Sequence, residues 1–282
     1  MTTQRSSEAG VMEVGDGIFA RLGGGTATNA AFILCDDTVV VIDSLMTPTL
    51  ARNLLADVQQ VTNKEIGYLV NTHHHGDHVF GNDFFPSARV IAHYKCRQVL
   101  AEAGQHFIRQ FAQGRPELAP ELATVNIRLP DATFSDRLTL YLGERQLELI
   151  HTGHGHTPDD IVIHLPQERM VFCGDLLFAG IMPVMRDGNS QGWMEAIGQV
   201  LALDAATVVP GHGHLSTGQD LVQERQFLAE MRQAVLGCFR RGMSEQEAIQ
   251  AVRMDEYGGW LAQERLPIGI SRIYAELSGG IR

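Results

Sequence analysis

The sequence lacks several features that would assign it to a specialised class of protein. None of its 282 residues form an apolar run of transmembrane length, and residues 1–8 are polar, unlike a signal region. The four cysteines are scattered without a disulfide framework, which favours a reducing compartment. The chain has 22 basic and 33 acidic residues and therefore a negative net charge. Because phosphate binding needs basic patches, this charge disfavours a nucleic-acid substrate. We therefore expect a cytoplasmic protein with a small-molecule substrate, no nucleic-acid or membrane partner, and a homodimer as an open alternative.

Hydrophobic residues make up 44% of the chain, enough for one large core with a small appendage. Apolar runs predict a strand at 18–21 and a hairpin through residues 30–34 and 39–42. Strands are expected to predominate from 124 to 178. Helical spacing of apolar residues predicts helices at 94–113, at 193–203 and in the segment with Leu50, Leu54, Val58 and Val61.

The most informative segment is Asn71–His78, which follows an apolar strand-like run. It places four potential metal ligands within six residues: His73, His75, Asp77 and His78. Imidazole nitrogen and carboxylate oxygen bind borderline-hard divalent ions such as Zn²⁺. Alternate side chains of a tight loop point to opposite sides, so His73 and His75 can face one ion while Asp77 and His78 face another. A polar His-rich loop without a metal is the alternative interpretation.

Three further ligand-type residues follow, each at the end of its own strand-like segment. They are His156 within Gly153–Thr157, Asp175 after a run beginning at Met170, and His212 within Pro210–Gly213. Neighbouring glycines let the backbone approach a metal closely. Each residue alone is more typical of an ordinary turn, but their joint occurrence in this order favours a metal site.

With these motifs the chain resembles the metallo-β-lactamase superfamily of hydrolases over roughly residues 12–215. The matching segments are His-x-His-x-Asp-His (73–78), Gly-His-Thr (155–157), Gly-Asp (174–175), Pro-Gly-His-Gly (210–213) and an early strand ending in Asp43. This motif set is specific to the superfamily but not to one activity within it. The resemblance implies an α/β fold, an αββα sandwich of two mixed sheets with helices outside, here with a C-terminal helical extension.

The same resemblance implies a dinuclear zinc centre, with iron or manganese as alternatives. The implied ligands are His73, His75 and His156 for one ion, Asp77, His78 and His212 for the other, and Asp175 as a bridge. Each ion would keep an open position, as catalytic sites do, and a metal-bound hydroxide would attack the substrate. Asp77 is the catalytic residue expected to orient that hydroxide.

The aspartate at position 175 indicates which branch of the superfamily the chain resembles. The best-known zinc β-lactamases carry cysteine there and another subclass carries serine, whereas Asp175 is similar to glyoxalase II enzymes, lactonases and related esterases. The resemblance therefore implies hydrolysis of a small-molecule ester, lactone, thioester or amide. The alternatives are an oxygenase resembling persulfide dioxygenases, with one iron on His73, His156 and Asp175, a β-lactamase, and a non-catalytic binding domain.

Several neighbouring residues are expected to support the site without binding metal. Asp43 and Thr72 are expected to orient ligand imidazoles, and Asp160 to act similarly near His156. His74 lies inside the motif, but we expect it to point away and to bond to the backbone.

Two residues close to Asp175 have separate interpretations. Cys173 has no evident base beside it and is interpreted as a small core residue. Arg186 is a nearby cation that could pair with a substrate carboxylate. The apolar segment 176–185 before it is consistent with an apolar substrate portion and equally with ordinary core packing.

Residues after the last motif are expected to be helical. An apolar stripe at helical spacing consists of Leu221, Leu228, Met231, Val235 and Phe239. Ser244 and Glu247 have the spacing of a capping box. We therefore divide the chain into a catalytic domain, residues 1–215, and a helical extension, residues 216–282. Trp260 in this extension could line a pocket or anchor a subunit contact.

Overall fold

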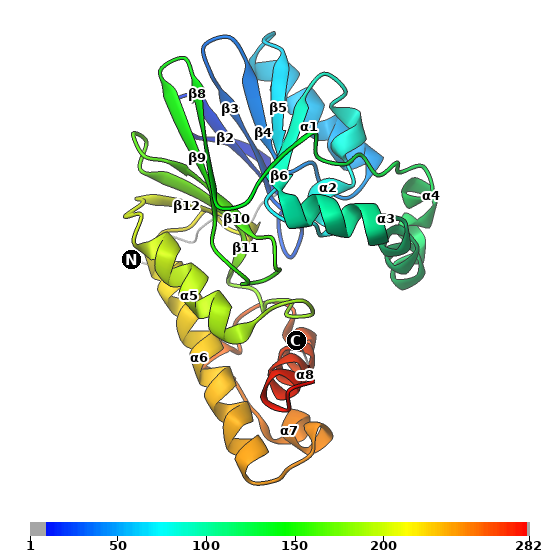
Figure 1. The fold of residues 1–282 in the computed structure, drawn as a ribbon, viewed down its shortest axis with the longest axis vertical. Helices are drawn as coiled ribbons and strands as arrows, with labels where there is room; N and C mark the ends of the chain where they lie inside the picture. The colour runs from blue at the N-terminus through cyan, green and yellow to red at the C-terminus, as the bar shows by residue number, and fades with distance from the viewer. Residues whose placement is uncertain (1–9, 281–282) are drawn as a thin grey trace.

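Two β-sheets face each other, with helices outside, in the computed structural model, which describes residues 10–280 (Figure 1). The larger sheet has the order β1-β2-β3-β4-β5-β6-β7. Its strands are β1 (Gly10–Gly15), β2 (Ile18–Leu22), β3 (Ala30–Leu34), β4 (Val39–Ile42), β5 (Ile66–Val70), β6 (Arg89–His93) and β7 (Ala132–Phe134). The smaller sheet has the order β12-β11-β10-β9-β8. Its strands are β8 (Arg137–Leu142), β9 (Arg145–His151), β10 (Ile161–Leu165), β11 (Met170–Ala179) and β12 (Thr207–Gly213).

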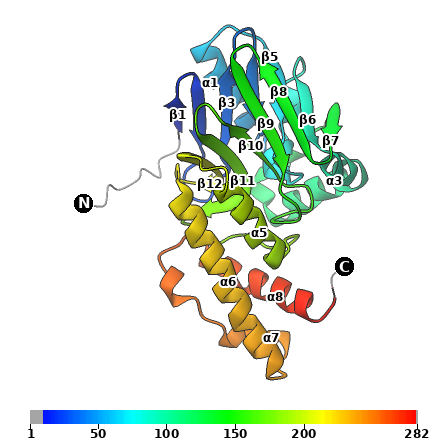
Figure 2. The ribbon, with the colours of Figure 1, turned by 60° about the vertical axis from the view of Figure 1, so that its left-hand side comes forward.

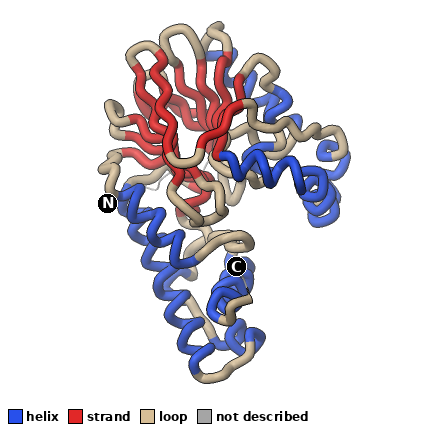
Figure 3. Tube along the Cα trace, in the orientation of Figure 1, coloured by secondary structure: helices blue, strands red, loops and turns tan. Residues whose placement is uncertain are grey.

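Helices surround the sheets and make up most of the C-terminal part (Figure 3). They are α1 (Pro48–Val61), α2 (Gly76–Val79), α3 (Tyr94–Gly114), α4 (Ala119–Leu122), α5 (Ser190–Leu201), α6 (Gly218–Arg240), α7 (Glu245–Ala251) and α8 (Leu266–Leu277). Short 3-10 turns span Asn82–Phe84, Pro116–Leu118, Asp255–Tyr257 and Gln263–Arg265. Within residues 10–280, no helix is both long and apolar enough to cross a membrane.

The side chains of β4 explain the layered arrangement. Val40 and Ile42 belong to the core between the two sheets, whereas Val39 and Val41 belong to the outer core that α1 covers. Successive side chains of a strand point to opposite faces, so an entirely apolar strand buries both. The hairpin and the strands predicted around it are therefore present, with both faces covered.

The helix predicted from the spacing of Leu50, Leu54, Val58 and Val61 is present as α1, and two of these four residues are buried. Ala51 is buried with Leu54 and Val58, whereas Leu50 and Val61 are 38% and 41% exposed. At about 100° per residue, Leu50 and Val61 lie together on one edge of the apolar stripe. The sheet covers the other edge, where Ala51 lies.

Strand β11 continues through the segment that was predicted to end in a turn at Asp175. Its parallel pairing with β12 is irregular between Phe172 and Phe178, and Gly174 within this stretch has φ +51°. A Cβ on Gly174 would lie 2.9 Å from Cβ of Thr72, so glycine is needed for both the conformation and the close approach. The irregularity therefore presents Asp175 from inside a strand.

Helices α5 and α6 pack against β11 of the smaller sheet, and α7 and α8 pack against α6 beyond the end of the sandwich (Figure 2). One hydrophobic cluster combines Val171 of the sheet with Trp193 of α5, Leu228 of α6 and Ile273 of α8. The predicted stripe of α6 is buried except for Phe239, which is half-buried. The expected helical extension thus shares its core with residues before 216, and the division at residue 215 stays a proposal.

Candidate metal centre

All seven ligand-type residues singled out in the sequence lie close together, most of them at or after the ends of strands and Asp175 inside a strand. They are His73 and His75 after β5, Asp77 and His78 in α2, His156 before β10, Asp175 in β11 and His212 in β12. The chain turns sharply at Gly76, where a Cβ would lie 2.4 Å from the Phe80 ring. Glycine at this position therefore lets four of the seven side chains follow one another in a tight loop.

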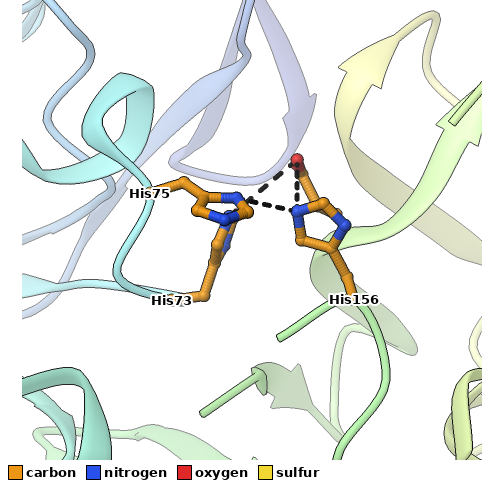
Figure 4. A group of neighbouring side chains, drawn as sticks. His73, His75 and His156 are labelled. Carbon is orange, nitrogen blue, oxygen red and sulfur yellow. Dashed lines mark hydrogen bonds and ion pairs between the residues drawn. The ribbon is translucent and has the colours of Figure 1, made fainter. Parts of the chain in front are cut away.

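The first group consists of His73, His75, His156 and Asp175, whose ligand-type atoms all lie within 4.8 Å of one another (Figure 4). His156 Nε2 is 2.9 Å from His75 Nδ1 and 3.3 Å from Asp175 Oδ2. His73 Nε2 lies 3.9 Å from the same oxygen. Three imidazole nitrogens and one carboxylate oxygen are a donor set that suits zinc.

The second group consists of Asp77, His78 and His212. Asp77 Oδ2 is 3.6 Å from His78 Nε2 and 3.3 Å from His212 Nε2. Asp175 reaches this group too, because its Oδ1 is 3.2 Å from His78 Nε2 and its Oδ2 is 3.3 Å from His212 Nε2. Asp175 therefore lies between the two groups.

Asp43 and Thr72 orient two of these imidazoles, as expected. Asp43 Oδ2 is 2.8 Å from His78 Nδ1, and this carboxylate also accepts hydrogen bonds from N and Oγ1 of Thr72. Thr72 Oγ1 is 3.1 Å from His73 Nδ1. With Nδ1 of both histidines engaged, their Nε2 atoms face the site.

Two other expected contacts differ from the prediction. His74 belongs to neither group, as expected, but its Nδ1 lies 2.6 Å from Asp159 Oδ1, and within residues 10–280 its ring makes no hydrogen bond to the backbone. Burial opposes protonation of His74, yet Asp159 raises its pKa above the usual value. Asp160 accepts hydrogen bonds from N and Oγ1 of Thr157, so it holds the loop and not the His156 ring.

The sequence did not reveal two further partners of the site. Thr28, in the connection before β3, donates a hydrogen bond from Oγ1 to Asp77 Oδ2 at 2.6 Å. Asp187 Oδ2 is 2.9 Å from His75 Nε2, which leaves Nδ1 of that ring for the first group. Neither residue belongs to a motif, and they are 49 and 112 positions from their partners. Only the folded chain brings them together.

Electrostatics place His73, His156 and Asp175 of the first group in the protonation states that bind metal. Burial lowers the pKa of His73 well below its usual value and lowers that of His156 to about 3, so both rings are neutral. Burial opposes ionisation of Asp175, but His212 and His78 hold its pKa well below the usual range. His212 differs, because Asp175 raises its pKa to about 9 despite burial. A cation bound there would have to displace a proton.

Cys173 and Arg186 occupy different surroundings. Cys173 is buried, and burial raises the pKa of its thiol, in agreement with a small core residue. Arg186 is exposed, and its carbonyl oxygen accepts a hydrogen bond from Arg272.

Comparison with known protein families shows the family to which the chain belongs. Residues 23–212 match the sequence profile of the metallo-beta-lactamase superfamily. The chain belongs to this superfamily. The resemblance inferred from the motifs and the sandwich fold that it implied are thereby confirmed.

Two relatives share about a quarter of their aligned residues with this chain. A linear primary-alkylsulfatase of Pseudomonas sp. is 22% identical over 255 residues, which cover 77% of this chain and 48% of the relative. A probable hydroxyacylglutathione hydrolase of Schizosaccharomyces pombe is 27% identical over 200 residues, or 67% of this chain and 65% of the relative. The chain thus spans about half to two thirds of these relatives.

Among solved structures, a stereoselective inverting sec-alkylsulfatase of Pseudomonas sp. has a similar fold, with a TM-score of 0.79. The two chains are 18% identical, and the likeness covers 97% of this chain and 51% of the other. It therefore extends beyond the sandwich into the C-terminal helices.

Proposed function

We propose that this superfamily member is a dinuclear zinc hydrolase that cleaves an ester, lactone, thioester or amide of a small molecule. The observation that carries the proposal is the position of Asp175 between two groups of imidazoles. Its carboxylate lies 3.3 Å from His156 and His212 and 3.2 Å from His78. Such a carboxylate suits a bridge between two cations. Four free, buried cysteines support a cytoplasmic location.

The donor atoms fit cations. Nε2 of His73, Nε2 of His78 and Oδ1 of Asp175 are buried and make no hydrogen bond within the described residues. Buried polar atoms without partners are costly, and a bound cation removes that cost. One ion would be held by His73, His75 and His156, the other by Asp77, His78 and His212, and both by Asp175.

Residues of the chain supply the remaining functions. When bound, two zinc ions supply a hydroxide nucleophile at neutral pH and positive charge beside the developing oxyanion. Asp77 is 19% exposed, and although burial opposes its ionisation, His78 and His212 hold the pKa of its carboxyl well below the usual range. The carboxylate therefore stays ionised and can orient the nucleophile by accepting a hydrogen bond from it. The hydrogen bond from Thr28 keeps this carboxylate in one orientation. Asp187 and Asp43 hold the imidazoles of His75 and His78.

A sulfate ester is a second candidate substrate. The similarity of the sequence to a primary-alkylsulfatase favours this substrate class. The fold of a sec-alkylsulfatase is also similar, and this similarity extends to the helices beside the site. These helices adjoin the segment after Asp175, where a substrate would lie.

Metal analysis and a hydrolysis screen test the proposal together. We expect two zinc ions per chain and turnover of at least one compound among a lactone, a thioester, an aryl ester, an amide and an alkyl sulfate. One iron per chain with oxygen consumption would instead support the persulfide-dioxygenase alternative. Two bound zinc ions without any hydrolysis would contradict the proposed function.

A further inference from the structure

A third group of ligand-type side chains adjoins the first group and shares one residue with it. His74, His75 and Asp187 offer nitrogen and carboxylate oxygen atoms that all lie within 4.8 Å of one another. His74 and Asp187 are not among the seven ligand-type residues, and neither binds a cation in the proposed reaction. Two imidazoles and a carboxylate are donors that zinc and similar divalent ions prefer.

His74 is fixed in the same way as a ligand imidazole of the metal centre. Its Nδ1 lies 2.6 Å from Oδ1 of the buried Asp159, just as Nδ1 of His78 lies 2.8 Å from Oδ2 of Asp43. A carboxylate at one ring nitrogen directs the other ring nitrogen toward a cation. Within residues 10–280, Nε2 of His74 makes no hydrogen bond. This nitrogen is therefore free to bind a cation.

Asp187 opens the third group to solvent. Its side chain is 50% exposed, and its Oδ2 lies 2.9 Å from His75 Nε2. The backbone around Asp187 is held in place, because its carbonyl accepts a hydrogen bond from His154 Nε2 at 2.6 Å. Two residues further on, the N–H of Asn189 donates to the carbonyl of Gly155. A cation can therefore reach a carboxylate that the surrounding loops already hold beside the two imidazoles.

His75 cannot serve the first and the third group at the same time. A neutral imidazole has a free lone pair on one ring nitrogen and a proton on the other. The carboxylate of Asp187 favours the tautomer with the proton on Nε2, so Nδ1 is free and faces the first group, 2.9 Å from His156 Nε2 (Figure 4). A cation bound by Asp187 and by Nε2 of His75 needs the other tautomer. The first group then loses one of its three imidazoles.

We infer that His74, His75 and Asp187 form an additional cation site that competes with the first metal position for His75, so that excess zinc inhibits the enzyme. The inhibition rests on the proposed hydrolase function, whereas binding of the extra ion does not. The additional site binds zinc more weakly than the groups around Asp175, because it gains His75 only at the expense of the first group.

Calorimetry on protein that already holds two equivalents of zinc tests the additional site without turnover. We expect a third, weaker zinc-binding event in the parent protein. His74→Asn should abolish it, because the asparagine amide can still donate to Asp159 but offers no second ring nitrogen to zinc. His106→Asn is the matched control, since His106 is exposed on α3 and belongs to none of the ligand-type groups among the described residues.

Asp187→Asn tests the same site from its carboxylate. The amide oxygen can still accept the hydrogen bond from His75 Nε2, but the negative charge is gone. The third binding event should weaken at least as much as after loss of a supporting residue, about tenfold or more. Asp204→Asn is the control, because Asp204 is an exposed carboxylate that also has one side-chain partner, Arg169.

Nitrogen-15 spectra of the imidazoles and hydrolysis rates test the competition for His75. The third equivalent of zinc should move coordination of His75 from Nδ1 to Nε2. Activity of the parent on a compound of the screen should fall as free zinc rises. His74→Asn should raise the zinc concentration for half inhibition about tenfold or more.

Four results would overturn the inference: a parent that binds only two zinc ions, a third event that survives in His74→Asn, its loss in His106→Asn as well, or a third event that leaves Nδ1 of His75 coordinated. If His74→Asn does not fold, Asp187→Asn decides between the same outcomes. A protein that hydrolyses no compound of the screen would contradict the proposed function, while the calorimetry and the spectra still decide whether the additional site exists.

Discussion

The strand-end loops and the C-terminal helices differ in how completely their buried polar groups are hydrogen-bonded. In and beside these loops, His73, His78 of α2 and Asp175 of β11 keep buried atoms without hydrogen-bond partners in the described structure. In the helices, Thr217 of α6 and Ser244 of α7 each complete a capping box. Buried polar groups without hydrogen-bond partners are unfavourable, and such unfavourable features are expected mainly at functional sites. The contrast indicates that the loops are arranged for a ligand and the helices for packing.

Two features connect these regions. Glu276 of α8 accepts hydrogen bonds from N and Oγ of Ser190 and from Arg232. The helices thereby hold the start of α5, three residues after Asp187, which orients His75. Glu224 of α6 is an exception among the helices. Both of its carboxylate oxygens are buried without a hydrogen-bond partner among the described residues.

The largest expected effect comes from Asp175→Ala, which removes the carboxylate between the two imidazole groups. Metal content should fall, and activity should fall about a thousandfold or more, since bound metals supply several kcal/mol of transition-state stabilisation. Elemental analysis and hydrolysis kinetics measure both quantities. Undiminished zinc with full activity would show that the loops are not arranged around this residue.

A smaller effect is expected for Asp43→Ala, which frees Nδ1 of His78 while leaving all seven ligand-type residues in place. Loss of such a supporting partner lowers metal affinity or activity about ten- to a hundredfold. Zinc titration against a competing chelator measures the affinity. Asp136→Ala, at an exposed carboxylate, is the control. An equal affinity in both variants would argue that Asp43 does not act through His78.

Among the helices, Trp260→Ala should reduce stability and leave the metal centre intact. The Trp260 ring packs against Phe227 and Tyr257, with centroids 5.1 and 4.8 Å away. Because Trp260 is only partly buried, we expect a loss of about 2 kcal/mol in the free energy of unfolding. Denaturation of the zinc-bound protein measures this loss, with zinc content, KM and mass determined alongside. A changed KM or mass with unchanged stability would instead support the pocket or subunit role considered from the sequence.

The smallest effect is expected for Ser244→Ala, which breaks the capping box of α7. Removing an N-cap side chain costs about 1 kcal/mol of stability. Zinc affinity and kcat/KM should match the parent, because within the described residues the Ser244 hydroxyl hydrogen-bonds to Glu247 and to no ligand-type residue. A loss of zinc in this variant would show that the C-terminal helices also support metal binding, contrary to the distinction drawn between helices and loops.

Individual strands, helices and the candidate ligands could be predicted from local patterns, whereas the two-sheet sandwich was implied by the resemblance to the superfamily. Apolar runs located the hairpin of β3 and β4, and the motif from His73 to His78 located the metal centre. Helical spacing predicted α1, but spacing alone does not say which edge of its apolar stripe the sheet covers. The partner of His74 was misjudged, because Asp159 is 85 positions away.

The sequence by itself determined which residues carry metal-binding donors, because the residue types and their spacing are written in it. Only the tertiary structure decided that Asp175 stands between two groups of imidazoles, since that position depends on an irregular strand and on the meeting of two sheets. It also decided that Thr28 and Asp187 hold Asp77 and His75. These contacts join segments far apart in the chain, and the packing of the sandwich and its helices alone determines which of them meet.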